Sequence, residues 1–328
     1  MSSQPAQPTL PRLMLGWPNF WIRRQARTLL AWLLLIVLFV LSTVLSESSR
    51  DPAVVIVTVK GATFIGMAAA AEFFVVVGGG IDLSIGSVAT VSGMAAAVLM
   101  NGRDGNIPLA VAATLGIGLI VGAINGLLVT WIKITPFVAT FGMLYILQGV
   151  AYTYSVNPVG QAAPSFYSLY VDNIAGVPIL LLIVAGFWAV CWYVARQTVF
   201  GKHLYAVGGD SEASRLAGVR TTRVSFASYV ICAVIAAAAG LLELTQTYVG
   251  AADLGATLLL TTITAVVIGG VSLFGGEGSI VGVLGGSLVL AFLGEFFNSV
   301  QINAFYQQLI EGLIILALLG IYRQKIKR

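Results

Sequence analysis

Residues 78–88 read GGGIDLSIGSV and interrupt a chain that is apolar for tens of residues on either side. An aspartate at the centre of a bilayer-spanning helix costs about 2.5–3.5 kcal/mol on insertion scales, so Asp82 is expected at a helix break or beside a polar path. Gly79 and Gly80 can break the helix, and Asp82 or Ser84 can cap the next one, whose first backbone N–H groups need acceptors. The stretch therefore predicts two helices separated by a break, which is either a structural cap or a gate.

The composition places the chain in lipid. Its 328 residues are 58% hydrophobic and only 9% charged, with a mean hydropathy of +0.96, whereas a soluble domain is about 25% charged. No polar stretch is long enough to form a separate water-facing domain. The two cysteines lie in apolar runs and there is one histidine, so neither a disulfide framework nor a metal centre is expected. The sequence predicts an all-α integral membrane protein with a single membrane domain.

Breaks at charges, prolines and glycine clusters divide the apolar sequence into about ten candidate transmembrane helices, some of them broken. They are 29–45, 54–77, 84–100, 108–132, 136–155, 177–195, 224–245, 257–274, 279–297 and 306–322. The small residues inside them, as in GIGLIVGAING at 116–126, are typical of helices that pack closely in lipid.

An even number of spans puts both termini on one side of the membrane. Of the 17 Lys and Arg residues, only Arg50, Lys60 and Arg103 then fall on the other side, and the positive-inside rule makes the termini cytoplasmic. The predicted regions are a cytoplasmic N-terminal segment (1–28), a single transmembrane domain (29–322) with one long cytoplasmic loop (196–223), and a basic cytoplasmic tail (323–328).

The long cytoplasmic loop 196–223 contains a second local signal, GGDSEASRLAG at 208–218. Asp210 or Ser211 can cap a short helix there, a glutamate suits its positive N-terminal end, and Gly218 can end it. Its alanines allow close approach of a partner. The segment is either a connector or a helix that docks a soluble partner, and the docking residues would be Asp210, Ser211, Glu212, Ala213, Ala217 and Gly218.

The remaining motifs exclude catalysis more clearly than they identify a solute. The chain has no G-x-x-x-x-G-K-[ST] motif for nucleotide phosphates, no H-E-x-x-H and no G-x-S-x-G, so it is not expected to be an enzyme. A neutral polyol needs hydrogen-bonding groups without strong charge, although embedded amides and hydroxyls also serve as bonds between helices. The candidate gate or pathway residues are Gly79, Gly80, Asp82, Ser84, Asn125, Thr140 and Gln148.

Several stretches together resemble the inner-membrane permease subunits of ribose-type ABC sugar importers. They are GGGIDLSIGS at 78–87, TPFVATFGM at 135–143, FGKHLYAVGGDSEASRLAGV at 200–219, AVVIGGVSLFGGEGSIVG at 265–282 and FYQQLIEGLIIL at 305–316. The resemblance runs from about residue 54 to 322. It implies a bacterial inner-membrane location and a coupling role for the 208–218 segment.

The resemblance also implies partners. These are a second permease subunit, identical or related, a cytoplasmic ATPase that is usually a tandem chain, a periplasmic sugar-binding protein and the surrounding lipid. ATP and Mg would be used by the ATPase, no cofactor by this chain, and no nucleic acid is expected.

The chain departs from that family's pattern at three places. Leu259–Ile263 replace an acidic E-L-D-A-I-A stretch, Gln148 stands where an arginine is usual, and Glu277 interrupts what is commonly G-G-R-G-S. These differences fit an atypical cargo or one half of a heteromeric pair.

A rival hypothesis is a self-sufficient secondary transporter or channel. It would couple transport to protons through the embedded carboxyl groups of Glu72 or Asp82, which would have to change protonation during the cycle. Such a protein would not need a docking helix.

Overall fold

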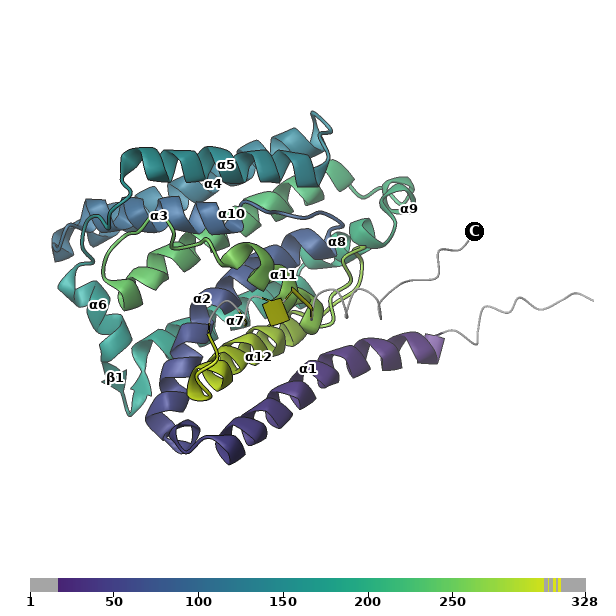
Figure 1. Ribbon diagram of the computed structural model, residues 1–328. Helices are drawn as coiled ribbons and strands as arrows, with labels where there is room; N and C mark the ends of the chain where they lie inside the picture. Colours follow the sequence, from purple (N-terminus) through teal and green to yellow (C-terminus); the bar gives the residue numbers. More distant parts are fainter. Residues whose placement is uncertain (1–16, 304–305, 307–308, 311, 314–328) are drawn as a thin grey trace, which may run out of the picture.

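The computed structural model describes residues 17–303 together with 306, 309–310 and 312–313. Residues 1–16 of the predicted N-terminal segment (1–28), the predicted tail 323–328 and most of the expected span 306–322 lie outside these residues, whereas α1 begins inside the predicted N-terminal segment, at Trp17. Figure 1 shows a bundle of helices, and the elements in chain order are α1 (Trp17–Leu45), η2 (Ser48–Arg50), α2 (Pro52–Val77), α3 (Ile85–Met100), η3 (Asp104–Asn106), α4 (Ile107–Thr130), α5 (Pro136–Tyr154), α6 (Pro164–Val171), β1 (Asn173–Ile174), β2 (Val177–Pro178), α7 (Ile179–Gln197), α8 (Val199–Gly209), α9 (Ser211–Leu216), α10 (Thr221–Thr247), α11 (Leu258–Ile268) and α12 (Ile280–Ser299).

The helices confirm the all-α membrane fold. Seven of those described are long and apolar enough to cross a membrane: α1, α2, α4 (with η3), α5, α7, α10 and α12. Two expected spans, 84–100 and 257–274, are instead shorter apolar helices, the 16-residue α3 and the 11-residue α11. α3 covers nearly all of its expected span, whereas α11 ends at Ile268 because residues 269–274 are not helical.

The second break packs against the start of α3. Residues 78–84 separate α2 from α3, and residues 248–257 separate α10 from α11. In the second break, a Cβ on Gly255 would lie 1.9 Å from the carbonyl oxygen of Gly86 in the first turn of α3, and Gly255 donates its N–H to the Thr90 hydroxyl of α3 at 2.9 Å. Only glycine allows backbones to approach so closely. The second break is therefore packed against protein rather than lipid.

The centre of the bundle is formed by α2 and α10, which pack against each other. The C-terminal half of α2 is buried continuously from Gly66 to Val77. One side of this centre is covered by α3, α4 and α5 and the other by α1, α11 and α12 (Figure 1). The core is thus a layer of helices on each face of a buried pair.

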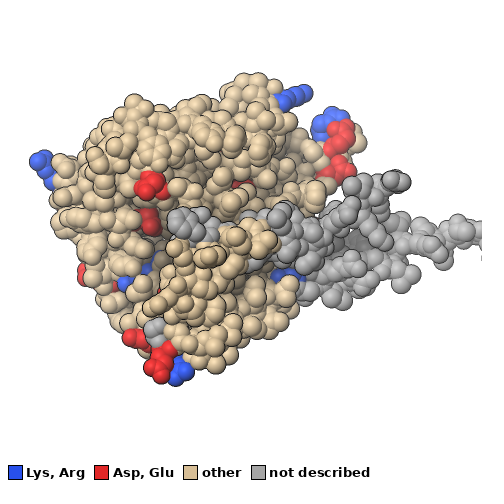
Figure 2. All heavy atoms as spheres, in the orientation of Figure 1, with Lys and Arg blue, Asp and Glu red and all other residues tan. Residues whose placement is uncertain are grey.

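The two ends of the bundle differ. One, here called the α9 end, carries α8 and α9, and the opposite α6 end carries α6 and the β1–β2 hairpin (Figure 1). The hairpin pairs Asn173 with Pro178 and Ile174 with Val177. In Figure 2 most of the visible charged side chains lie toward the ends of the helices, with a largely neutral surface between them. This distribution suits a protein that crosses a bilayer along the helix axes.

The glycine-rich stretch of α4 packs as its small residues predict. Gly118, Gly122 and Gly126, each four residues after the last, face α10, and a Cβ on Gly122 would lie 2.7 Å from the Val230 Cα. Spacing of this kind lets two membrane helices come into backbone contact.

We expect Gly122→Ala to lower the thermal stability of the purified protein, because the added methyl group meets α10 backbone and overpacking of this kind costs about 1–3 kcal/mol. The matched control is Gly116→Ala on the same helix, where nothing lies within 4 Å of a new Cβ. Thermal unfolding in detergent measures both variants. Equal stability of the two would contradict the close α4–α10 contact.

Candidate functional site

Asp82 organises the break between α2 and α3. Its Oδ1 accepts hydrogen bonds from the Ser84 N–H at 2.9 Å and from the Ser84 hydroxyl at 2.6 Å. Ser84 occupies the N-cap position of α3, but its side chain accepts no capping bond from the helix. Of the two expected caps, Asp82 is therefore the one whose side chain satisfies a backbone donor, through a turn just before the helix.

Two of the predicted residues, from helices later in the sequence, form hydrogen bonds with this turn. The Asn125 amide donates to the Ser84 hydroxyl at 2.9 Å, and the Leu83 N–H donates to the Thr140 hydroxyl at 3.1 Å. Asn125 lies on α4 and Thr140 on α5. The break is thus held from two neighbouring helices, and all four polar side chains are buried, with at most 3% of their surface exposed.

Glu72 and Tyr229 complete the cluster. The Asp82 N–H approaches Glu72 Oε1 at 3.4 Å, and a Cβ on Gly80 would lie 2.4 Å from the Tyr229 hydroxyl. Neither Glu72 nor Asp82 takes part in any salt bridge among the described residues. Sequence reasoning did not place Tyr229 here, because its partners are about 150 residues earlier in the chain and no local pattern connects them.

Gln148 does not belong to this cluster. Its amide donates to the Ala252 carbonyl at 2.7 Å and so supports the other break, residues 248–257. The seven predicted gate residues therefore divide between the two breaks: Gly79, Gly80, Asp82, Ser84, Asn125 and Thr140 at the first, and Gln148 at the second.

The first break is in backbone contact with the base of α8. Gly276 donates its N–H to the Val77 carbonyl at 2.9 Å, and a Cβ on Gly208 would lie 1.8 Å from that same oxygen. Gly79, with φ +85°, approaches both Gly208 and Gly275. We call Val77, Gly79, Gly208, Gly275 and Gly276 the glycine junction. It joins the end of α2, the end of α8 and the loop before α12.

The short helix α9 forms as its caps predict. Asp210 is the N-cap and accepts from the Ala213 N–H at 2.8 Å, and Gly218 follows the helix with φ +88°. Glu212 and Arg215 form two hydrogen bonds, at 2.9 and 2.6 Å. The guanidinium holds the pKa of Glu212 below its usual value, so this exposed carboxyl group keeps its charge.

Most of α9 faces solvent. Ser211, Glu212, Ala213, Ala217 and Gly218 are exposed, whereas Ser214 is buried against the bundle. Leu216, which was not among the predicted docking residues, is 74% exposed. Its signal in the sequence is a large apolar side chain in an otherwise polar, small-residue loop.

The segment before α9 is also helical, which the sequence did not predict. α8 is capped by the Thr198 hydroxyl, which accepts from the Gly201 N–H at 3.1 Å, and it buries Leu204 and Val207. Its glycines at 208 and 209 end the helix instead of preceding α9 as a loop. α8 thus anchors α9 on the bundle.

Glu277, one of the positions that depart from the family pattern, has a described partner. It forms a salt bridge with Arg27 of α1, with 2.9 Å between Oε2 and Nη1. The Tyr205 hydroxyl of α8 donates to the carbonyl of the next residue, Gly278, at 2.9 Å. These contacts tie the loop before α12 to α1 and α8.

Apolar helices broken at buried polar residues, with a capped helix projecting from one end, define an integral membrane transport protein. The chain belongs to the family described as branched-chain amino acid transport system / permease component, which matches residues 54–319.

Individual relatives are sugar import permeases. The ribose import permease protein RbsC of Escherichia coli (strain K12) is 34% identical over 247 residues, covering 74% of this chain and 77% of that protein. The fructose import permease protein FrcC of Rhizobium meliloti is 34% identical over 274 residues, covering 78% and 74%. The L-arabinose transport system permease protein AraH of Escherichia coli (strain K12) is 33% identical over 266 residues, covering 80% and 81%. No solved structure matches the chain. The resemblance to permeases of ribose-type ABC sugar importers is confirmed.

We expect Asp82→Asn to fold better than Asp82→Leu. The asparagine carbonyl can still accept from the Ser84 N–H and hydroxyl, whereas leucine leaves these buried donors unpaired at a cost of about 1–3 kcal/mol for each group. Membrane yield and thermal unfolding of the purified variants measure the difference. If both variants are equally stable, the Asp82 turn does not hold the break.

Proposed function

We propose that the chain is the permease subunit of an ATP-driven importer that moves a small sugar or sugar-like polyol into the cytoplasm. The observation that carries this proposal is α9, a capped and exposed helix that is anchored by α8 at one end of the bundle. A separate ATPase, which we expect to be a tandem chain, would dock there and use ATP and Mg. This chain itself would bind no nucleotide. A second permease subunit and a periplasmic binding protein complete the proposed complex.

The position of α9 supports mechanical coupling. α9 follows α8 directly, and the end of α8 meets the end of α2 at the glycine junction. A backbone contact without intervening side chains transmits displacement with little slack, because neither partner can rotate out of the way. A pull on α9 would therefore act on the break that holds Asp82 and its partners, which we assign as the gate.

A basic recess adjoins α9. It has a volume of about 380 Å³ and is lined by Phe200, His203, Gly218, Arg220, Arg223 and Val224. Its two arginines suit an acidic side chain of a docking partner, since guanidinium and carboxylate form paired hydrogen bonds. The exposed Leu216 and this recess together give the docking surface an apolar and a cationic part.

One observation favours the rival, a proton-coupled transporter. Glu72 and Asp82 are both buried next to each other without a described salt bridge. A proton taken up and released by this pair could drive transport. That hypothesis leaves α9 without a role, and for this reason we favour the ATP-driven importer.

We expect Leu216→Asp and Glu212→Lys to weaken co-purification of the ATPase and cargo-stimulated ATP hydrolysis in proteoliposomes, because each alters the exposed face of α9 without touching the core. Gly218→Leu should act similarly, since a side chain at φ +88° strains the end of the helix. The control is Val156→Asp at the α6 end, which is also 74% exposed. Normal coupling in all three α9 variants would make α9 an ordinary connector.

Orientation can be tested with single introduced cysteines in intact cells. We expect Asn173→Cys at the α6 end to react with a membrane-impermeant thiol reagent and Ala213→Cys on α9 not to react, because α9 would face the cytoplasm. Both positions are exposed, and the native Cys191 and Cys232 are buried and provide the background. Labelling at position 213 from outside would reverse the proposed orientation.

A further inference from the structure

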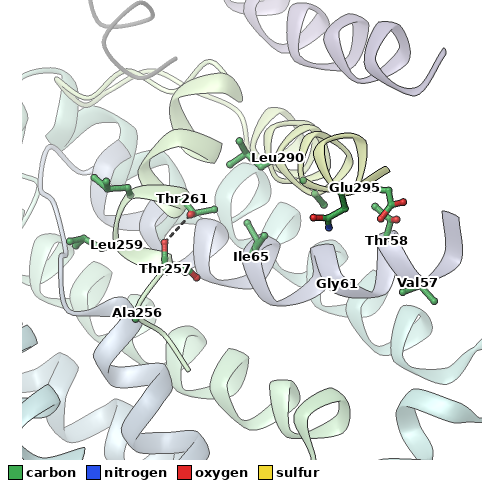
Figure 3. A pocket seen from close by; sticks show the side chains of 14 residues that line it. Val57, Thr58, Gly61, Ile65, Ala256, Thr257, Leu259, Thr261, Leu290 and Glu295 are labelled. Atoms are coloured by element: carbon green, nitrogen blue, oxygen red, sulfur yellow. Dashed lines mark hydrogen bonds between the residues drawn. The ribbon is translucent and has the colours of Figure 1, made fainter. Parts of the chain in front are cut away.

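A cavity of about 600 Å³ lies between α2, α11 and α12. Figure 3 shows Thr58 and Glu295 at one side of it and Thr257 and Thr261 at the other, with Ile65 between them. The volume is in the range of small-molecule sites. None of the predicted gate residues lines this cavity.

Part of the cavity wall is backbone that is not helical. Ala256 and Thr257, which line it, belong to the break between α10 and α11. Irregular backbone at membrane depth is tolerated only where protein buries it or where it borders a water-filled space. The break therefore gives a physical reason for a polar opening at this place, independent of the side chains that line it.

The lining includes side chains that can accept hydrogen bonds, from Thr58 and Glu295, and the Asn298 amide, which can both donate and accept. The Thr58 hydroxyl donates to the Val54 carbonyl at 2.9 Å, and the Thr261 hydroxyl donates to the Thr257 carbonyl at 2.8 Å. A hydroxyl has one proton, so the Thr58 oxygen can serve a ligand as an acceptor. Glu295 adds a half-buried carboxylate, which accepts hydrogen bonds only.

Within the described part of the chain, no cationic side chain in the cavity wall offsets the Glu295 carboxylate. The described residues that line the cavity include no Lys, Arg or His. An anionic solute would meet the Glu295 charge in partly apolar surroundings, where repulsion between like charges is stronger than in water. A solute with many O–H groups and no negative charge would instead find acceptors for its donors and, on Leu259 and Leu290, apolar surface for its C–H faces.

We propose that this cavity is a cargo-binding site for a neutral, polyhydroxylated solute, with Glu295 as the main hydrogen-bond acceptor and as the group that rejects anions. This inference rests on the proposed function, since it identifies where the imported solute contacts the permease.

The test measures how solutes protect a cysteine in the cavity. The experiment uses this chain alone in proteoliposomes, without binding protein. Thr261→Cys is modified with a small neutral maleimide in the presence of high millimolar D-ribose, D-fructose or L-arabinose. At least one sugar should slow the modification several-fold. D-ribonate, which carries the hydroxyl groups of D-ribose on an open chain that ends in a carboxylate, should not.

In the Thr261→Cys background, Glu295→Gln should weaken protection by the sugar and let D-ribonate protect. Two controls keep the result specific: Glu243→Gln changes an embedded carboxyl group outside the cavity, and Asn173→Cys reports a site at the α6 end. Neither should respond. The proposal is overturned if no sugar protects position 261, if D-ribonate protects as well as D-ribose in the parent protein, or if Glu295→Gln changes nothing.

The two proposals fail in different ways. If the α9 variants couple normally and a sugar still protects position 261, the cavity remains a solute site of a protein that is not ATP-driven through α9. If the α9 variants lose coupling and no sugar protects position 261, the importer stands and this cavity is not its cargo site.

Discussion

The structure depends on one backbone contact, in which the Val77 carbonyl at the end of α2 accepts from the Gly276 N–H while Gly208 packs against the same oxygen. No residue larger than glycine fits at position 208, because a Cβ there would lie 1.8 Å from that oxygen. The contact closes the end of α2 and holds α8 and the loop before α12 in place. It also leaves no room for side chains to absorb a displacement, which makes it suited to join a docking helix to the membrane domain.

A second constraint is the scarcity of water at the two helix breaks. Each free backbone group there needs a partner from the protein. At the first break Asp82 and Thr140 accept from backbone N–H groups, and at the second Thr90 accepts from Gly255 while Gln148 donates to Ala252. The polar residues that the sequence grouped as one pathway therefore stabilise the backbone at two separate breaks. This role is compatible with a gate, because bonds that hold a break closed are also the bonds that must rearrange for it to open.

The sequence predicted those features whose causes are local. The α9 caps, the break at the glycines before Asp82 and the small-residue face of α4 each depend on residues within one or two turns of each other. The partners of Gln148 and Tyr229 could not be predicted, because they are brought together by packing across more than a hundred residues in each case. α8 was missed because its glycines at 208 and 209 are typical of a turn. In the structure they end a helix, and a side chain at position 208 would collide with the end of α2. In the sequence Glu277 was only a departure from the family pattern. In the structure it forms a salt bridge with Arg27 of α1, 250 residues earlier in the chain.

α2 connects the proposed parts of the transporter. Thr58, Gly61 and Ile65 line the cavity, and Glu72 lies seven residues after Ile65, which on an α-helix returns to nearly the same face. One stripe of α2 thus runs from the cavity to the buried carboxyl groups, and the helix ends at the glycine junction. Because this half of α2 is buried on all sides, it can move only together with the residues packed around it. A displacement of α8 would then be felt at the gate and at the cavity through the same helix, without a separate relay of side chains.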